Sequence, residues 1–159
     1  SDTDVKAIVA YLSSVDPVEN VVPPSVYRIP TPQSYGPPVT HVATVSPRNE
    51  LAYGRYLATI GHCIECHTPM GPDGRRAYDT ELGAGSEVFK GPWGTSVSAN
   101  ITQRGLGQFS DAQLKSIITT GVLPNGMRLK PPMPFAYYAR IKPSDLDALI
   151  VFLRALPAR

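Results

Sequence analysis

Two thiols and an imidazole stand together in the segment Cys63-Ile64-Glu65-Cys66-His67. This Cys-x-x-Cys-His spacing is the attachment signature of a c-type haem. The two sulfurs add across the vinyl groups on one edge of the porphyrin, and two intervening residues span the distance between those groups. The adjacent histidine then lies beneath the iron and donates an imidazole nitrogen, the usual proximal ligand. The segment therefore predicts one covalent haem, bound through Cys63 and Cys66, with His67 as an iron ligand.

Three other interpretations of this segment stay open. A structural zinc site needs about four ligands, and outside the segment the chain offers only His41 and His62 as nitrogen donors and no second cysteine pair. A thioredoxin-like dithiol is expected beside a βαβ pattern, which the sequence lacks. The third is a chance occurrence of the motif in a protein without a cofactor. The residue types and their spacing favour haem over all three.

An iron atom held by His67 needs a sixth ligand or an open position on its other side. Met70 follows His67 by three residues, which extend to about 10 Å at most. That length is too short to reach the opposite face of the macrocycle. His62 adjoins Cys63 and therefore lies on the attachment side.

Met133 is the favoured sixth ligand. It stands in Pro131-Pro132-Met133-Pro134, where proline fixes the backbone on both sides and suits a thioether held at one distance from the iron. Met127 adjoins a turn and is expected at the surface or in a pocket wall. Met127, His41 and an open sixth position remain alternatives.

Helices are the elements expected to position these residues. The first predicted helix runs from Pro47, which suits a first turn, to Gly61. The second opens with a capping box at residues 110–113 and ends at Gly121. The third opens at Ser144, carries one apolar stripe and ends before Pro157. Because no stretch alternates convincingly with a period of two, we expect an all-α domain.

The first 46 residues differ from the rest of the chain. Prolines crowd positions 17–47, and the whole chain has 17 of them among 159 residues, about twice the usual share. Residues 3–15 match residues 144–156 at a constant offset of 141, and such a repeat is typical of tandem units. We therefore predict three parts, which are a helix at 1–16 that ends a preceding similar domain, a proline-rich linker or strap at 17–46, and the haem domain at 47–159.

Composition narrows the class of protein. The length suggests about one domain. The net charge of +2 excludes a strongly basic nucleic-acid binder. No apolar run reaches the roughly 18 residues of a membrane span, so no transmembrane segment is expected. The first residues lack the pattern of a secretion signal, so we expect a mature chain or a piece of a longer one.

The chain resembles a class I c-type cytochrome, and is most similar to modules of the multi-haem cytochrome c subunits of periplasmic alcohol, aldehyde and sugar dehydrogenases. The similarity covers about residues 48–157. Besides Cys-x-x-Cys-His and the closing helix, it rests on five segments: Gly54-Arg55-Tyr56-Leu57-Ala58, Leu82-Gly83-Ala84-Gly85, Asn100-Ile101-Thr102, Gly105-Leu106-Gly107-Gln108-Phe109-Ser110-Asp111 and Pro131-Pro132-Met133-Pro134-Phe135. The chain departs from the family where Gln103-Arg104 replaces Pro-Asp and where Phe109 replaces tryptophan.

The resemblance implies a class I cytochrome c fold, in which N- and C-terminal helices pack together and short helices and loops surround one haem. It implies haem on Cys63 and Cys66, and iron bound by His67 and Met133. Trp93 and Asn100 are candidate contacts to the haem pocket or propionates, with a core tryptophan and a loop cap as the alternatives.

The implied function is one-electron transfer in the periplasm, from a dehydrogenase towards an oxidase or other respiratory acceptor, without catalysis by this domain. Further cytochrome domains upstream in a longer parent chain are expected from the repeat. The competing function is a haem enzyme or ligand-binding domain with an open sixth position.

Overall fold

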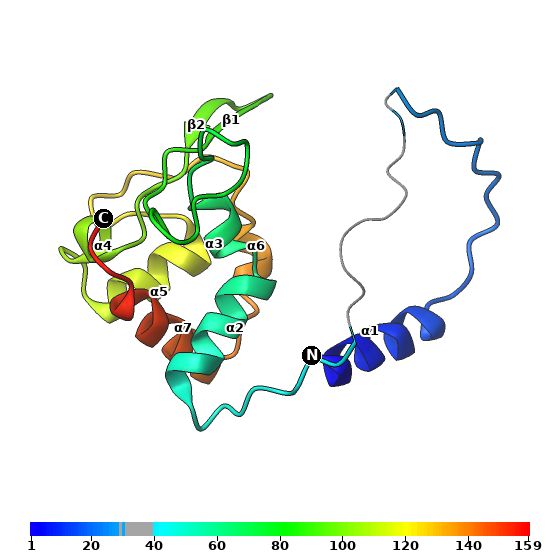
Figure 1. The fold of residues 1–159 in the computed structure, drawn as a ribbon, viewed down its shortest axis with the longest axis horizontal. Coiled ribbons are helices and arrows are strands. Elements are labelled where there is room, and N and C mark those ends of the chain that lie inside the picture. Colours follow the sequence, from blue (N-terminus) through cyan, green and yellow to red (C-terminus); the bar gives the residue numbers. More distant parts are fainter. Residues whose placement is uncertain (29, 31–39) are drawn as a thin grey trace. The chain divides into compact units, whose positions relative to one another are not determined.

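The computed structural model describes residues 1–28, 30 and 40–159, and the chain divides into two units, Ser1–Val45 and Ser46–Arg159 (Figure 1). Positions 29 and 31–39 of the predicted proline-rich strap lie outside the described residues. None of the described helices is long and apolar enough to span a membrane.

The first unit contains helix α1 (Asp2–Ser14). A capping box starts the helix, because the Ser1 side chain accepts from the Asp4 backbone N–H and the Asp4 carboxylate accepts in return. Residues 41–44 return to this end of the helix, where the Asp2 carboxylate accepts from the Val42 N–H at 2.9 Å and lies 2.6 Å from His41 Nδ1. No residue of α1 is buried, so its apolar side chains face solvent within this unit.

The second unit is built on the packing of α2 (Glu50–Ile60) against α7 (Pro143–Ala155). The two helices approach closely at Gly54, where an added Cβ would lie 1.9 Å from the Ala148 carbonyl oxygen. The buried apolar residues of this unit form one core, to which α7 contributes most: Ala58, Ile101, Leu114, Leu146, Leu149, Ile150, Phe152, Leu153 and Leu156.

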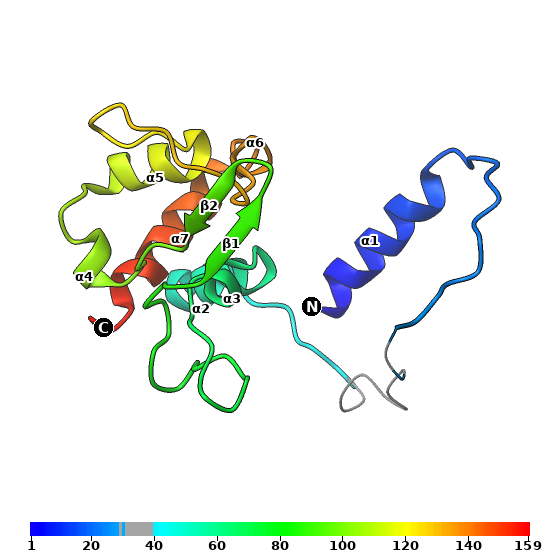
Figure 2. The same cartoon turned by 90° about the horizontal axis from the view of Figure 1, so that it is seen from above.

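Short elements complete the second unit (Figure 2). They are α3 (Cys63–Cys66), β1 (Val88–Gly91), β2 (Gly94–Val97), α4 (Gln103–Leu106), α5 (Asp111–Thr120) and α6 (Phe135–Tyr138). Helix α5 packs against α6 and α7, and α4 packs against α7. Long loops join these elements, as the many glycines between 68 and 109 predict.

The helix-rich fold is confirmed, but the expectation of an all-α domain is wrong. Strands β1 and β2 form an antiparallel hairpin in which Val88 pairs with Val97 and Gly91 with Gly94. Four residues are too few for a period-two pattern to stand out. A turn that uses Gly94 at φ +90° makes the reversal possible, and backbone pairing holds the strands together.

The predicted helix ends are close but not all correct. Helix α5 has the predicted capping box and ends at Gly121 in the left-handed conformation. Helix α2 begins at Glu50, after Pro47, because the Asn49 side chain accepts from the Ala52 N–H and caps it. Helix α7 begins at Pro143, one residue before Ser144, with proline in its first turn.

Candidate functional site

The Cys-x-x-Cys-His segment forms a single helical turn directly after α2. Gly61 ends α2, and His62 takes the left-handed conformation at φ 58°, which redirects the chain into α3. The His67 N–H donates to the Cys63 carbonyl at 2.9 Å and closes the turn. Since residues three apart share a helix face, this turn presents Cys63 and Cys66 on the same side.

Both cysteines are free thiols. Burial raises the pKa of Cys63 to about 11 and also raises the pKa of Cys66. Both therefore stay protonated at neutral pH in the chain as described. A raised thiol pKa does not suit a redox dithiol, whose reactive cysteine has a lowered pKa.

One ring nitrogen of His67 forms a hydrogen bond with the backbone. Its Nδ1 lies 2.6 Å from the Ala99 carbonyl oxygen. Because that oxygen only accepts, Nδ1 carries the proton and Nε2 is left with a free lone pair. Burial lowers the pKa of His67, with the bond to Ala99 acting in the opposite direction. The ring is thus neutral and oriented, as an imidazole ligand of a metal must be.

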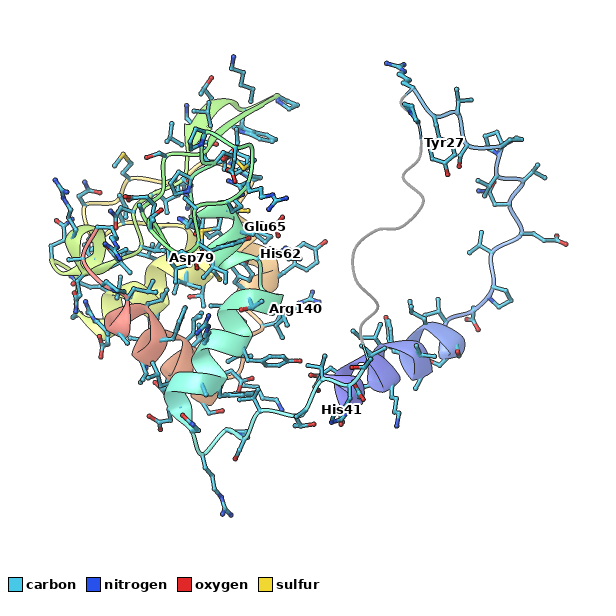
Figure 3. The ribbon with its side chains drawn as sticks, viewed as in Figure 1. Tyr27, His41, His62, Glu65, Asp79 and Arg140 are labelled. Carbon is cyan, nitrogen blue, oxygen red and sulfur yellow. The ribbon has the colours of Figure 1, made fainter. Side chains whose placement is uncertain are left out.

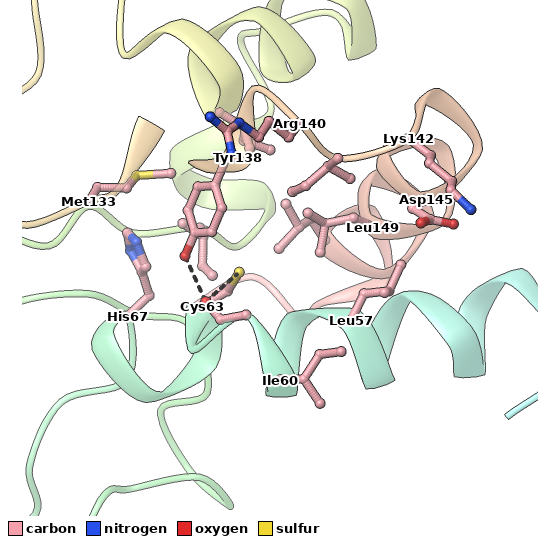
Figure 4. A pocket seen from close by; sticks show the side chains of 15 residues that line it. Leu57, Ile60, Cys63, His67, Met133, Tyr138, Arg140, Lys142, Asp145 and Leu149 are labelled. Carbon is pink, nitrogen blue, oxygen red and sulfur yellow. Dashed lines mark hydrogen bonds between the residues drawn. The ribbon is translucent and has the colours of Figure 1, made fainter. Parts of the chain in front are cut away.

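Two cavities meet at this histidine, with volumes of about 450 Å³ and 290 Å³. They share Gly61, Cys63, His67, Met133 and Tyr138. The larger one is walled by aliphatic side chains from α2, α5 and α7, among them Leu57, Ile118, Leu149 and Leu153. Figure 4 shows His67 and Met133 at the same end of this cavity, on elements that lie on either side of it.

The donor set fits a c-type haem. Two thiols on one helix face, one neutral imidazole and one thioether border an apolar space, and these are the groups that such a haem takes from a protein. Cys63 and Cys66 would hold the macrocycle and His67 would bind its iron. Among the described residues, no three His, Cys, Asp or Glu side chains are grouped as ligands of another metal ion.

Met133 differs from the other two methionines. Its side chain is half-buried and lines both cavities. Met70 is 50% exposed and Met127 is 55% exposed, and neither lines either cavity. The structure therefore brings Met133 together with His67.

The other two candidate nitrogen ligands have carboxylate partners. His62, which caps α3, borders the smaller cavity, but its side chain is exposed and its Nδ1 lies 2.5 Å from the Glu65 carboxylate (Figure 3). His41 belongs to the first unit, where it pairs with Asp2.

Trp93 and Asn100 do not line either cavity. The Trp93 ring covers Gly91 in the β1–β2 turn, and its buried Nε1 has no hydrogen-bond partner among the described residues. The Asn100 side chain orders the turn before α4, where its oxygen accepts from the backbone and hydroxyl of Thr102 and its nitrogen donates to the Arg159 carbonyl. Contacts of Trp93 and Asn100 with a haem stay predictions.

No motif in the sequence marks Tyr138, which the structure places between the two cavities. Its hydroxyl donates to the Gly61 carbonyl at 2.7 Å, the bond drawn in Figure 4. Burial raises its pKa to about 12. Charged residues at the larger cavity are also unmarked in the sequence: Arg140, Lys142 and Asp145.

Comparison with known proteins agrees with the chemistry of the site. The chain is similar to cytochrome c domains of dehydrogenase subunits, which confirms the resemblance predicted from its motifs, and the helix-rich fold with a small sheet is compatible with a cytochrome c-like fold. No family model matches the chain.

Three relatives illustrate the similarity. The cytochrome c subunit of alcohol dehydrogenase (quinone) from Gluconacetobacter polyoxogenes is 31% identical over 102 residues, which are 62% of this chain and 20% of the relative. The fructose dehydrogenase cytochrome subunit of Gluconobacter japonicus is 30% identical over 109 residues, 67% of this chain and 21% of the relative. A diheme cytochrome c-type protein of Cereibacter sphaeroides is 31% identical over 111 residues, 68% of this chain and 36% of the relative. The chain thus spans about a fifth of the length of the dehydrogenase subunits that it matches.

Proposed function

We propose that this chain is a one-electron carrier with one c-type haem bound covalently through Cys63 and Cys66, and with His67 and Met133 as the axial ligands. One observation carries the proposal. Met133 is the methionine that lines the same two cavities as Cys63 and His67. When bound, the haem supplies exchange of a single electron at iron.

The protein residues restrict the site to that chemistry. If His67 and Met133 both bound the iron, no position would be left on it for a substrate. The aliphatic walls from α2, α5 and α7 would limit the access of water to a bound haem. A methionine ligand favours the reduced iron, and a hydrophobic shell acts on the potential by controlling dielectric and solvent access.

The direction of electron flow is proposed from the relatives. Several of them are cytochrome subunits of dehydrogenases for alcohol, fructose and gluconate. We propose a dehydrogenase as electron donor, an oxidase or other respiratory protein as acceptor, and the periplasm as location. In this role the domain transfers electrons and does not itself act on the organic substrate.

We further propose that residues 1–16 end a preceding cytochrome domain and that 17–46 link it to the haem domain at 47–159. The support is a comparison of α1 with α7. Each position of α7 that is buried in the core has an apolar residue at the matching position of α1: Val5, Ala7, Ile8, Val9, Tyr11 and Leu12 stand for Leu146, Ala148, Leu149, Ile150, Phe152 and Leu153. Helix α1 thus has the apolar residues to pack on another helix in the way that α7 packs on α2.

The decisive experiment replaces the proposed sulfur ligand in the haem-bound protein. Met133→Ala is expected to remove the weak absorption band at the red end of the oxidised spectrum, to lower the midpoint potential and to let the reduced protein bind carbon monoxide. Met127→Ala is the matched control, since that side chain is exposed and lies outside both cavities. It should leave all three unchanged.

Two results would contradict the proposal. Carbon monoxide binding by the unaltered reduced protein would indicate an open sixth position and favour a haem enzyme. If no haem stays attached to the purified protein after denaturation, the proposed covalent haem is ruled out.

A further inference from the structure

One extended segment, residues 96–99, contacts both of the elements that carry the proposed axial ligands. At one end of it, the Ser96 hydroxyl donates to the Pro131 carbonyl at 2.6 Å. At the other end, the Ala99 carbonyl accepts from His67 Nδ1 at 2.6 Å. Only two residues, Val97 and Ser98, therefore separate the contact to the methionine loop, residues 131–134, from the contact to the histidine.

The hairpin fixes this segment in place. Ser96 is in register with Phe89 of the neighbouring strand, and both side chains line the smaller cavity with Met133. Beyond the strand, the Ser98 N–H donates to the Glu87 carbonyl at 2.8 Å, and the Ser98 carbonyl accepts from the Ser86 N–H at 2.9 Å. Residues 96–99 thus have a partner along most of their length.

The methionine loop has few other means of attachment. Proline has no backbone N–H, so in residues 131–134 only Met133 has a backbone donor. The Met133 and Pro134 carbonyls accept from the first turn of α6, within the same stretch of chain. Among the hydrogen bonds of the described residues, the bond from Ser96 is the one that ties residues 131–134 to a different element.

We propose that Ser96 is a positioning residue for Met133. This inference rests on the proposed ligation by His67 and Met133. The Ser96 hydroxyl holds residues 131–134 in place, so that the Met133 thioether stays within reach of the iron. Removing the hydroxyl lets the loop move away, so that an external ligand competes better with the sulfur. A neutral hydrogen bond at a half-exposed position contributes modestly to stability, so the expected effect is a few-fold change in ligand affinity.

The test is titration of the oxidised haem protein with imidazole, which binds iron only when the sulfur has left. Ser96→Ala is expected to raise the apparent affinity for imidazole roughly threefold to tenfold and to weaken the red absorption band. Ser96→Thr retains the hydroxyl and should restore both. Thr95→Ala is the control on the same strand, because Thr95 is exposed and offers the loop only its backbone carbonyl, which the substitution retains.

A double variant separates positioning from general destabilisation. If Ser96 acts through Met133, Ser96→Ala adds no further gain in imidazole affinity to Met133→Ala. An unchanged affinity in Ser96→Ala, or an equal gain with and without Met133, overturns the role of Ser96 and leaves the methionine ligand intact. If Met133→Ala itself leaves the affinity and the red band unchanged, the proposed ligation fails instead.

Discussion

At the scale of single residues, Gly54 sets the distance between the two main helices. A Cβ at this position would lie 1.9 Å from the Ala148 carbonyl oxygen and 2.9 Å from the Phe152 Cβ. Neither atom is the end of a flexible side chain, so α2 and α7 must move apart to admit a methyl group. Leu149 and Leu153 of α7 also line the larger cavity, so the helix contact supports one wall of the site.

Gly54→Ala is therefore expected to lower the free energy of unfolding by about 1–3 kcal/mol, the usual cost of overpacking a core. Alanine is otherwise the better helix former, so a loss must come from the collision. Denaturant unfolding of the haem-bound protein measures it. Arg55→Ala is the comparison, because it places alanine at an exposed position of the same helix. A Gly54→Ala protein as stable as the unaltered one would contradict the close helix contact.

The buried hydroxyl of Tyr138 makes the stability of the folded protein depend on pH. Its folded-state pKa is raised from 10.0 to about 12, chiefly by burial. Because the unfolded state releases this proton first, the contribution of Tyr138 to stability is complete below about pH 10 and declines as the pH rises towards 12. Tyr138→Phe should make unfolding less sensitive to pH in that range. Tyr137→Phe, at a side chain that is 74% exposed, should not. Identical alkaline unfolding of the two variants would contradict a buried hydroxyl.

At the scale of elements, Arg154 of α7 joins three parts of the core unit. Its guanidinium donates to the Leu106 carbonyl at the end of α4, to the Phe109 carbonyl, and to the Asp111 carboxylate at the start of α5. A planar group with five donors can serve all three acceptors at once, whereas an ammonium cannot.

Arg154→Lys keeps the charge and is expected to lower the free energy of unfolding by about 1–2 kcal/mol, since the two carbonyls lose a charged donor. Arg104→Lys is the matched control at an exposed position of α4. Thermal unfolding compares the two variants. Equal midpoint temperatures of unfolding would mean that the guanidinium of Arg154 does not hold the three elements together.

The elements that the sequence predicts are those whose signals are local. The ends of α5 follow from Ser110, Gln113 and Gly121, and the core face of α7 follows from its apolar spacing. The β1–β2 hairpin depends on pairing between residues such as Phe89 and Ser96, and four-residue strands leave no pattern in the sequence. The start of α2 shifts because Asn49 caps better than Pro47 can.

The residues of the candidate site also differ in whether a local sequence signal predicts them. Cys63, Cys66 and His67 are adjacent in sequence, so their spacing alone predicts their chemistry. That Met133 shares a cavity with His67 depends on how the chain returns after α5, and its proline neighbours are the only local signal. Tyr138 and Ser96 have no local signal, because their partners, Gly61 and Pro131, are distant in sequence.

At the scale of the whole molecule, the two units use similar helices in opposite environments. Helix α7 buries its apolar face in the core, whereas the matching face of α1 is exposed, with Ile8 at 57% and Leu12 at 63%. An isolated helix of 13 residues is marginal in water. The packing, and not the sequence pattern, must therefore decide how stable each helix is.

Amide hydrogen exchange on the 159-residue haem protein tests this. Amides within α7 should open only with a free energy near that of global unfolding, which is roughly 5–15 kcal/mol for a domain. Amides within α1 should exchange at least about a thousandfold faster, a difference of about 4 kcal/mol. Helix α2 is the internal control and should match α7. Equal protection of α1 and α7 would mean that α1 already has a packing partner in this chain, and would remove the reason to seek one in a preceding domain.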